Sequence, residues 1–341
     1  MASTERTFLK SDNTATVCPE LFAALRAANV RCGDAYDSDA WSARLDDVFS
    51  SFFATRCRVF TTATGTAANA LSLAVLCPSF GAVLCHALSH IENDECGAPE
   101  FFSGGAKLIT CEGANGKLTV PALEAVLASK RPGIHQMPPR ALSITQATEC
   151  GTTYTPDEVR ALTDFAHRQG LRVHMDGARL PNAIVHLGCE PADITWRAGV
   201  DVLSFGVVKN GGLSAEAAIV FDATLAQEMA YRRKRAGQLL SKSRFQAAQL
   251  LAYIESGVWE RNARRANEAA QIAGRALAAY LAYPVEANMI FARLGTLEAR
   301  LREHGFEFHV LPSGEARLVF SWDTPPAQVQ RLVRCVEARL K

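Results

Sequence analysis

The sequence has no long hydrophobic run and no excess of charge of either sign. Its longest apolar stretches, such as residues 67–77, fall well short of the roughly 20 residues that a helix needs to span a bilayer. The first residues lack the apolar core of a secretory signal peptide. The 36 Lys and Arg nearly balance the 35 Asp and Glu, so the charge does not suggest nucleic acid or an anionic membrane as a partner. We therefore expect a cytoplasmic globular protein that binds neither.

The ten cysteines lack the spacing of a disulfide framework or a metal site. No CxxC pair occurs, and no Cys/His cluster has zinc-ligand spacing. Several cysteines lie inside apolar segments, which favours buried free thiols in a reducing compartment over disulfides. We expect no metal ion.

Short apolar runs alternate with helical patterns through the first two thirds of the chain. One predicted helix follows residues 62–69 and ends at Cys77. Another begins at Thr155, with Pro at the first helical position and acids in the first turn, and Gly170 follows its end. This alternation predicts an α/β fold with a mainly parallel sheet covered on both faces. The predicted strands are Arg58–Phe60, Ala82–Cys85, Lys107–Thr110, Ala141–Thr145, Arg172–Met175, Val202–Phe205 and Ala218–Phe221.

The last third has a different pattern. Long helices run from about residue 224 to about residue 281, and three strand-like runs and a closing helix from about residue 326 follow. The runs are MIFARL (289–294), FEFHVL (306–311) and ARLVFSW (316–322). We predict a large domain at 1–245, which includes the N-terminal segment, and a small α+β domain at 246–341.

HMDGARLPNA (174–183) places Asp176 directly after a buried strand. That is the carboxyl edge of the sheet, where α/β folds bind ligands. Gly177 permits a tight turn, and Arg179 offers a planar fork for a carboxylate or phosphate. A surface Asp–Arg ion pair is the alternative.

DVLSFGVVKNGG (201–212) places Lys209 after an apolar strand and before Asn-Gly-Gly. A lysine removed from water can condense with an aldehyde. A solvated lysine before a flexible loop is the alternative.

TATGTAAN (62–69) places Gly65 and Thr66 between a strand and a helix N-terminus. Backbone N–H groups and a hydroxyl make an anion site there, although a helix-capping Thr is the alternative. The segment is neither a P-loop nor the dinucleotide fingerprint. A phosphate cradle, a strand-end Asp and a strand-end Lys together form the constellation that pyridoxal phosphate needs.

These segments resemble the low-specificity L-threonine aldolases of the aromatic amino-acid β-eliminating lyase group. The resemblance covers nearly the whole chain and implies the aspartate aminotransferase fold type I, with a seven-stranded large-domain sheet. It is carried by SDNTATVCPE (11–20), TGTAANALSL (64–73), SHIENDECGAPEFFSGGAKL (89–108), HMDGARLPNA, DVLSFGVVKNGG and ARLVFSW.

The resemblance implies roles in cofactor binding. Lys209 would hold the aldehyde carbon of pyridoxal 5'-phosphate, and Asp176 would keep its pyridine nitrogen protonated. Gly65 and Thr66 would bind the phosphate. His90 would stack on the ring and face the substrate hydroxyl.

It also implies how the substrate is held. Ser11, Arg179 and Arg317 would bind the substrate carboxylate, and Arg179 is also expected at the cofactor. Arg235 and Lys242 resemble a basic region that reaches the phosphate site of a neighbouring subunit. The family implies a homotetramer built as a dimer of dimers.

The chain departs from the family at one position. Better-known threonine aldolases have a second active-site histidine where ITQATECGTTY (144–154) has Glu149. The β-hydroxyl proton could pass to Glu149, directly or through a water, or to His90. An imidazole ordinarily has a pKa of about 6.5 and a glutamate about 4.3, which favours His90 as the base with Glu149 positioning a water.

The implied reaction is cleavage of the Cα–Cβ bond of L-threonine, L-allo-threonine or related β-hydroxy-α-amino acids, including phenylserine. The products are glycine and an aldehyde. A β-eliminating lyase or an aminotransferase on the same scaffold would also keep Lys209 and Asp176. A non-catalytic amino-acid-binding protein is disfavoured because such a protein is expected to lose one of them.

Overall fold

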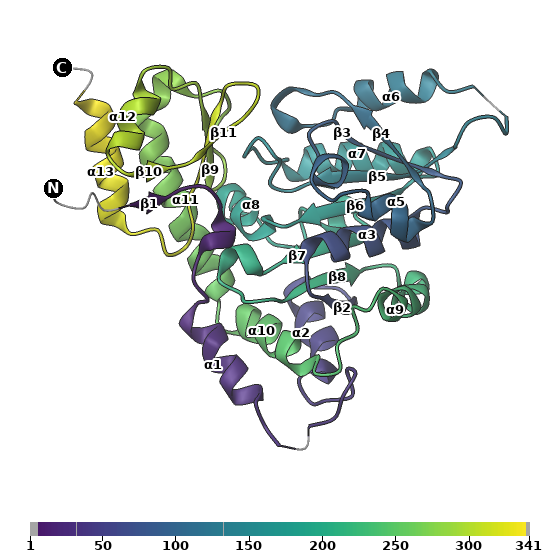
Figure 1. Cartoon of the computed structure of the whole chain (residues 1–341). Helices are drawn as coiled ribbons and strands as arrows, with labels where there is room; N and C mark the ends of the chain where they lie inside the picture. Colours follow the sequence, from purple (N-terminus) through teal and green to yellow (C-terminus); the bar gives the residue numbers. More distant parts are fainter. Residues whose placement is uncertain (1–5, 32, 132, 339–341) are drawn as a thin grey trace.

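The computed structural model describes residues 6–31, 33–131 and 133–338, and its centre is a seven-stranded sheet (Figure 1). The strand order is β2-β8-β7-β6-β5-β3-β4. Only β8 runs antiparallel to its neighbours, so the predicted mainly parallel sheet is confirmed. The strands are β2 (Arg58–Thr62), β3 (Ala82–His86), β4 (Lys107–Cys111), β5 (Pro139–Thr145), β6 (Arg172–Gly177), β7 (Val202–Gly206) and β8 (Glu216–Val220).

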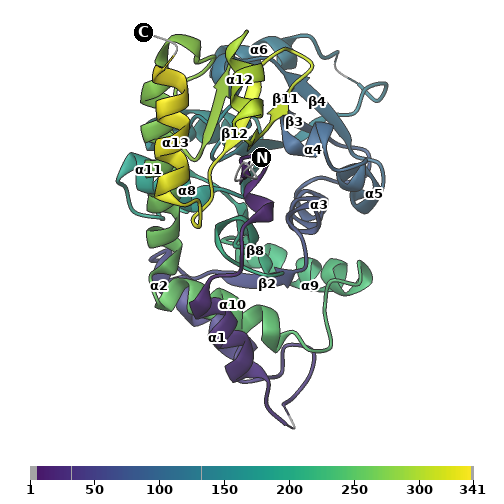
Figure 2. The same ribbon diagram turned by 60° about the vertical axis from the view of Figure 1, so that its left-hand side comes forward.

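Helices cover both faces of this sheet (Figures 1 and 2). One apolar core includes Leu71 of α3 and Met229 of α9. The core on the other face includes Phe49 of α2, Phe165 of α7 and Leu250 of α10. The helices are α1 (Pro19–Ala28), α2 (Leu45–Phe52), α3 (Gly65–Leu76), α4 (His90–Asn93), α5 (Ala98–Ser103), α6 (Val120–Ala128), α7 (Pro156–Arg168), α8 (Leu180–Leu187), α9 (Ala226–Arg235), α10 (Arg244–Glu255), α11 (Val258–Ala276), α12 (Leu297–Glu303) and α13 (Pro326–Glu337).

The ends of α7 form as their sequence predicts. Thr155 and Glu158 make a reciprocal capping box, in which each side chain accepts a hydrogen bond from the other residue's backbone N–H. Past the other end, Gly170 has a φ of +73°, the left-handed conformation that glycine adopts at little cost.

The C-terminal part differs from the prediction in one strand. Residues 306–311 divide into β10 (Phe306–Glu307) and β11 (His309–Val310). β11 joins a sheet of order β11-β12-β9, with β12 at Ala316–Val319 and β9 at Met289–Ala292. β10 instead pairs in parallel with β1 (Thr7–Phe8), a partner that local pattern could not predict.

The N-terminal segment therefore connects the two parts of the chain. Leu9 is buried in the C-terminal core with Leu297 and Leu332, whereas α1 packs on α10 at the far end (Figure 2). The segment between them passes the carboxyl edge of the large sheet. The domain division at residue 245 stays a prediction.

The described part of the chain contains no helix long and apolar enough to cross a membrane. The nine cysteines at described positions are all free thiols. Seven of them are buried, as their apolar surroundings predict.

Candidate active site

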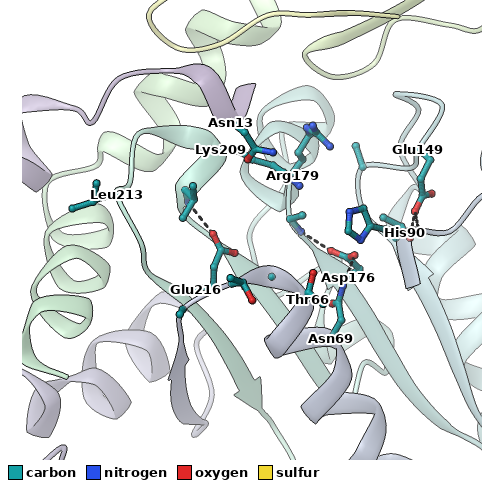
Figure 3. A pocket seen from close by; sticks show the side chains of 17 residues that line it. Asn13, Thr66, Asn69, His90, Glu149, Asp176, Arg179, Lys209, Leu213 and Glu216 are labelled. Atoms are coloured by element: carbon teal, nitrogen blue, oxygen red, sulfur yellow. Dashed lines mark hydrogen bonds between the residues drawn. The ribbon is translucent and has the colours of Figure 1, made fainter. Parts of the chain in front are cut away.

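A cavity with a volume of about 300 Å³ lies at the carboxyl edge of β5, β6 and β7, against the N-terminus of α3 (Figure 3). It brings together Lys209, Asp176, Thr66, His90 and Glu149. These residues come from separate segments of the sequence, and each was predicted to be a site residue. Its lining residues are Asn13, Ala63, Thr64, Gly65, Thr66, Asn69, His90, Thr145, Ala147, Glu149, Asp176, Ala178, Arg179, Val208, Lys209, Leu213 and Glu216.

Asp176 lies at the end of β6 and is buried. Burial alone would raise its pKa, but the positive charge of Lys209 and hydrogen bonds from the Ala178 N–H (3.0 Å) and the Asn69 amide (2.8 Å) lower the pKa overall. Asp176 is therefore an anion at neutral pH. The alternative of an Asp176–Arg179 surface ion pair is wrong, because Arg179 pairs with Asp12.

Lys209 lies in a short 3-10 helix, Val208–Asn210, directly after β7. The following turn needs glycine at position 211, where φ is +112° and a β-carbon would lie 2.9 Å from the Asn262 amide nitrogen. The Gly211 carbonyl accepts a hydrogen bond from the Cys18 N–H (2.9 Å), which ties this turn to the start of α1. The Asn-Gly-Gly sequence is thus a packed turn that presents the lysine to the cavity.

Gly65 and Thr66 are the first residues of α3. Thr64, not Thr66, caps this helix, because the Thr64 hydroxyl accepts a hydrogen bond from the Ala67 N–H (3.1 Å). The Thr66 hydroxyl is therefore free of a capping role and faces the cavity (Figure 3). The first N–H groups of a helix have no hydrogen-bond partners within the helix, and they attract anions.

His90 is half-buried and belongs to a hydrogen-bonded chain that could not be predicted from the sequence. Its Nδ1 lies 2.8 Å from the Glu95 carboxylate, and the Asn69 amide bridges Glu95 and Asp176, at 2.8 Å from each. The hydrogen bond that His90 donates to Glu95 raises the pKa of His90 against the opposing effect of burial. These hydrogen bonds use Nδ1 and fix the orientation of the imidazole, so Nε2 is the ring nitrogen that does not contact Glu95. Glu95 and Asn69 lie within the quoted motifs, but nothing local indicated that their side chains meet.

Glu149 lies beside His90 and the end of β5. Its Oε1 accepts hydrogen bonds from the His90 N–H (2.8 Å) and the Thr145 hydroxyl (3.0 Å). Its Oε2 is buried without a hydrogen-bond partner within the described residues. Burial and then the negative charge of Asp176 raise the pKa of Glu149 to about 7.

Two arginines and one carboxylate lie at this site, but of the predicted arginines Arg179 lines the cavity and Arg317 does not. Arg179 makes a bidentate ion pair with buried Asp12, with N–O distances of 2.7 and 2.8 Å. Arg317 on β12 donates from Nη2 to the Lys10 carbonyl (3.2 Å), and its buried Nε has no partner among the described residues. Burial, together with the nearby charge of Arg179, lowers the pKa of Arg317. An unpaired buried guanidinium N–H suits a carboxylate that enters from outside.

Three further predicted site residues do not line the cavity. The Ser11 hydroxyl accepts a hydrogen bond from the Asn13 N–H (3.1 Å) and caps the short helix Asp12–Thr14, while Asn13 itself lines the cavity. Arg235 ends α9 beside a separate surface hollow, and Lys242 is exposed between α9 and α10. Within one chain, neither Arg235 nor Lys242 lines the cavity.

The residues present fit pyridoxal phosphate. The cavity holds an amine for the aldehyde, a buried anionic carboxylate for the pyridinium and a helix N-terminus for the phosphate. Among the described residues, no group of three or more His, Cys, Asp or Glu side chains is arranged to hold a metal ion.

Fold and site together define a pyridoxal-phosphate enzyme of the aspartate aminotransferase fold type. A solved aspartate aminotransferase from Rhodobacter sphaeroides has the same fold, with a TM-score of 0.69 at 15% identity over 98% of this chain and 94% of its own. The threonine aldolase of Leishmania major superposes with a TM-score of 0.90 at 25% identity, over 98% of this chain and 99% of its own.

Sequence comparison narrows the class. The family described as beta-eliminating lyase matches residues 9–295. A low specificity L-threonine aldolase from a Pseudomonas species is 47% identical over 335 residues, which are 96% of each chain. The chain belongs to the beta-eliminating lyase family.

Proposed function

We propose that this protein is a pyridoxal-phosphate-dependent carbon–carbon lyase that cleaves L-threonine, L-allo-threonine and related β-hydroxy-α-amino acids, including phenylserine, to glycine and an aldehyde. The observation that carries the proposal is a single cavity that holds Lys209, anionic Asp176 and a half-buried Glu149 whose pKa is about 7. Its close similarity to a low specificity L-threonine aldolase supports the same activity.

Lys209, Asp176, Gly65 and Thr66 would hold the cofactor, which when bound supplies an acceptor for the electron pair of the Cα–Cβ bond. Asp176, whose pKa is lowered, would carry the negative charge that favours the protonated, electron-accepting pyridine ring. The Asn69–Glu95–His90 chain holds that carboxylate and the imidazole in fixed positions.

Arg317 and Arg179 would bind the substrate α-carboxylate. Arg179 is already neutralised by Asp12, whereas Arg317 has an unpaired buried N–H. We therefore assign the main contact with the substrate carboxylate to Arg317, and the Arg179–Asp12 pair would lie beside that carboxylate. Fixing the carboxylate sets the rotation about the Cα–N bond and so selects which bond of Cα is cleaved.

Glu149 is the better candidate for the group that takes the β-hydroxyl proton. The sequence-based preference for His90 depended on the low ordinary pKa of glutamate, and burial removes that difference. Glu95 raises the pKa of His90, which makes its imidazole less available as a proton acceptor near neutral pH. In this assignment the hydroxyl proton passes to Glu149 Oε2 as the carbonyl of the aldehyde forms and the Cα–Cβ bond breaks.

The test is a visible absorption spectrum of the purified protein followed by product analysis with L-threonine. If the protein is a pyridoxal-phosphate-dependent aldolase, it should be yellow because of the bound cofactor, and it should form acetaldehyde and glycine from L-threonine in equal amounts. Ammonia with a 2-oxo acid would instead indicate β-elimination, and transfer of the amino group to an added 2-oxo acid would indicate an aminotransferase.

The same proposal includes a cytoplasmic homotetramer, a dimer of dimers in which subunits share active sites. It is supported by the position of Arg235 and Lys242, which lie on the surface away from their own cavity. Mixing Lys209→Ala and Arg235→Ala subunits tests the sharing. Recovered activity after refolding the mixture is expected, because one mixed site has both native residues. No recovery would contradict it.

A further inference from the structure

Glu216, the first residue of β8, is a buried carboxylate in the cavity that the reaction does not use. Its side chain is 6% exposed, and it lines the cavity together with Lys209 and Gly65 (Figure 3). It is separate from the group formed by Asp176, His90 and Glu95.

The two oxygens of Glu216 have different surroundings. Oε1 accepts hydrogen bonds from the N–H groups of Val207 (3.3 Å) and Val208 (3.0 Å), the residues directly before Lys209. Oε2 has no donor among the described residues. A β-carbon built on Gly65 would lie 3.8 Å from Oε2, so this oxygen faces the N-terminus of α3. That is the end of the cavity where an anion would bind.

Burial favours the neutral form of this carboxyl. Burial raises the pKa of Glu216 to about 7, and the charge of Asp176 on β6 acts in the same direction. Lys209 and the two backbone N–H groups oppose the rise. Tyr253 of α10, whose pKa is raised by burial and also by the charge of Glu216, is neutral at this pH. An anion at the start of α3 would raise the pKa further, because two adjacent negative charges cannot both be stable out of water.

We propose that Glu216 is a cofactor-binding residue, which in its protonated form donates a hydrogen bond from Oε2 to the phosphate of pyridoxal phosphate. One carboxyl group would then join the phosphate to the backbone that carries Lys209. The proposal depends on the proposed function only in requiring that pyridoxal phosphate binds in this cavity. A neutral carboxylic acid kept as a hydrogen-bond donor near pH 7 has precedent in other enzyme sites.

The proposal predicts cofactor affinity that falls with pH. Above the pKa, the bound complex must keep a proton that free Glu216 has lost, so the dissociation constant rises about tenfold per pH unit. Glu216→Gln removes this dependence. Its amide oxygen can still accept from Val207 and Val208, and its NH₂ can donate to the phosphate at every pH.

The experiment measures dissociation constants of pyridoxal phosphate and of pyridoxal for cofactor-stripped full-length protein between pH 6 and 9. Pyridoxal lacks the phosphate but keeps the aldehyde and ring. Wild type, Glu216→Gln and a control, Ser214→Ala, are compared. Ser214 is an exposed residue two positions earlier whose hydroxyl donates a hydrogen bond to the Ala63 carbonyl, at 3.4 Å.

Above pH 7, we expect the affinity of wild type and of Ser214→Ala for pyridoxal phosphate to fall about tenfold per pH unit. The affinity of Glu216→Gln should fall less steeply. Pyridoxal should show no difference between wild type and Glu216→Gln. Equal slopes for pyridoxal phosphate in wild type and Glu216→Gln overturn the role of Glu216. A Glu216→Gln variant that binds more than tenfold more weakly at pH 6 also overturns it, because a carboxylate would then be required. A wild type that binds pyridoxal phosphate at no pH overturns the proposed function as well.

Discussion

Replacing Glu149 with Gln tests the assignment of the proton acceptor. The amide keeps the shape of the side chain, and its oxygen can still accept from the His90 N–H and the Thr145 hydroxyl, but the amide takes no proton at Oε2. Loss of a general base commonly costs a factor of about 10² to 10⁴ in rate. This corresponds to about 3 to 5 kcal/mol of barrier. We expect kcat/KM for threonine cleavage to fall within that range while cofactor absorbance remains.

The pH profile provides the sharper measurement. With its pKa raised from 4.5 to about 7, Glu149 is mostly ionised, and so able to accept a proton, above pH 7, and its ionised fraction falls about tenfold for each pH unit below that. Wild-type kcat/KM at pH 5 should therefore be about a hundredfold below its plateau, whereas a group at its ordinary pKa would lose less than about twofold. Glu149→Gln should abolish this acidic limb.

A second variant separates Glu149 from other groups that titrate near pH 7. Thr145→Val removes one hydrogen bond that lowers the pKa of Glu149 and keeps the carboxylate. It should move the midpoint of the acidic limb to higher pH while the plateau changes little. If Glu149→Gln keeps both the limb and activity within about tenfold of wild type, or about 1.4 kcal/mol, and His90→Asn loses them, then His90 is the base.

Three further predictions concern the groups around the cofactor. Lys209→Ala should fold but lose the visible absorbance of lysine-bound cofactor and nearly all turnover; cofactor fixed by borohydride to a different lysine, found by peptide mapping, would exclude this assignment. Asp176→Asn should keep the yellow colour and lose catalysis by orders of magnitude, and a loss of less than about tenfold, or about 1.4 kcal/mol, would argue against its role. Glu95→Gln should lower the pKa of His90, because the carboxylate hydrogen bond that raises it becomes neutral. An unchanged imidazole titration by NMR would show that Glu95 does not position His90.

Local pattern predicted the parts of this fold that depend on neighbouring residues in sequence. The ends of α7 follow from Thr155, Pro156 and Gly170, since capping and chain reversal need only adjacent backbone. Sheet strands were predictable because both faces are covered and their side chains are apolar. The division of residues 306–311 was not, because β10 pairs with β1 almost 300 positions away.

The site divides in the same way. The positions of Asp176 and Lys209 in the cavity were predictable because Asp176 lies at the end of one buried strand and Lys209 comes three residues after another. Glu95 and Asp12 were missed, because their roles come from tertiary contacts with His90 and with Arg179. Acidic residues in ordinary helical or loop sequence give no local signal that they will be buried.

The carboxyl groups in the cavity have different surroundings, and their pKa values are therefore shifted in different directions. Asp176 receives N–H hydrogen bonds and faces Lys209, so its pKa is lowered although it is fully buried. Glu216 is also buried and Glu149 is half-buried with a buried Oε2, and the pKa of each rises to about 7. After burial itself, the negative charge of Asp176 contributes to both shifts. In our proposals this one anion would serve the cofactor ring and would also help to raise the pKa of its two neighbours, so that Glu149 can take a proton from the substrate and neutral Glu216 can donate a hydrogen bond to the phosphate.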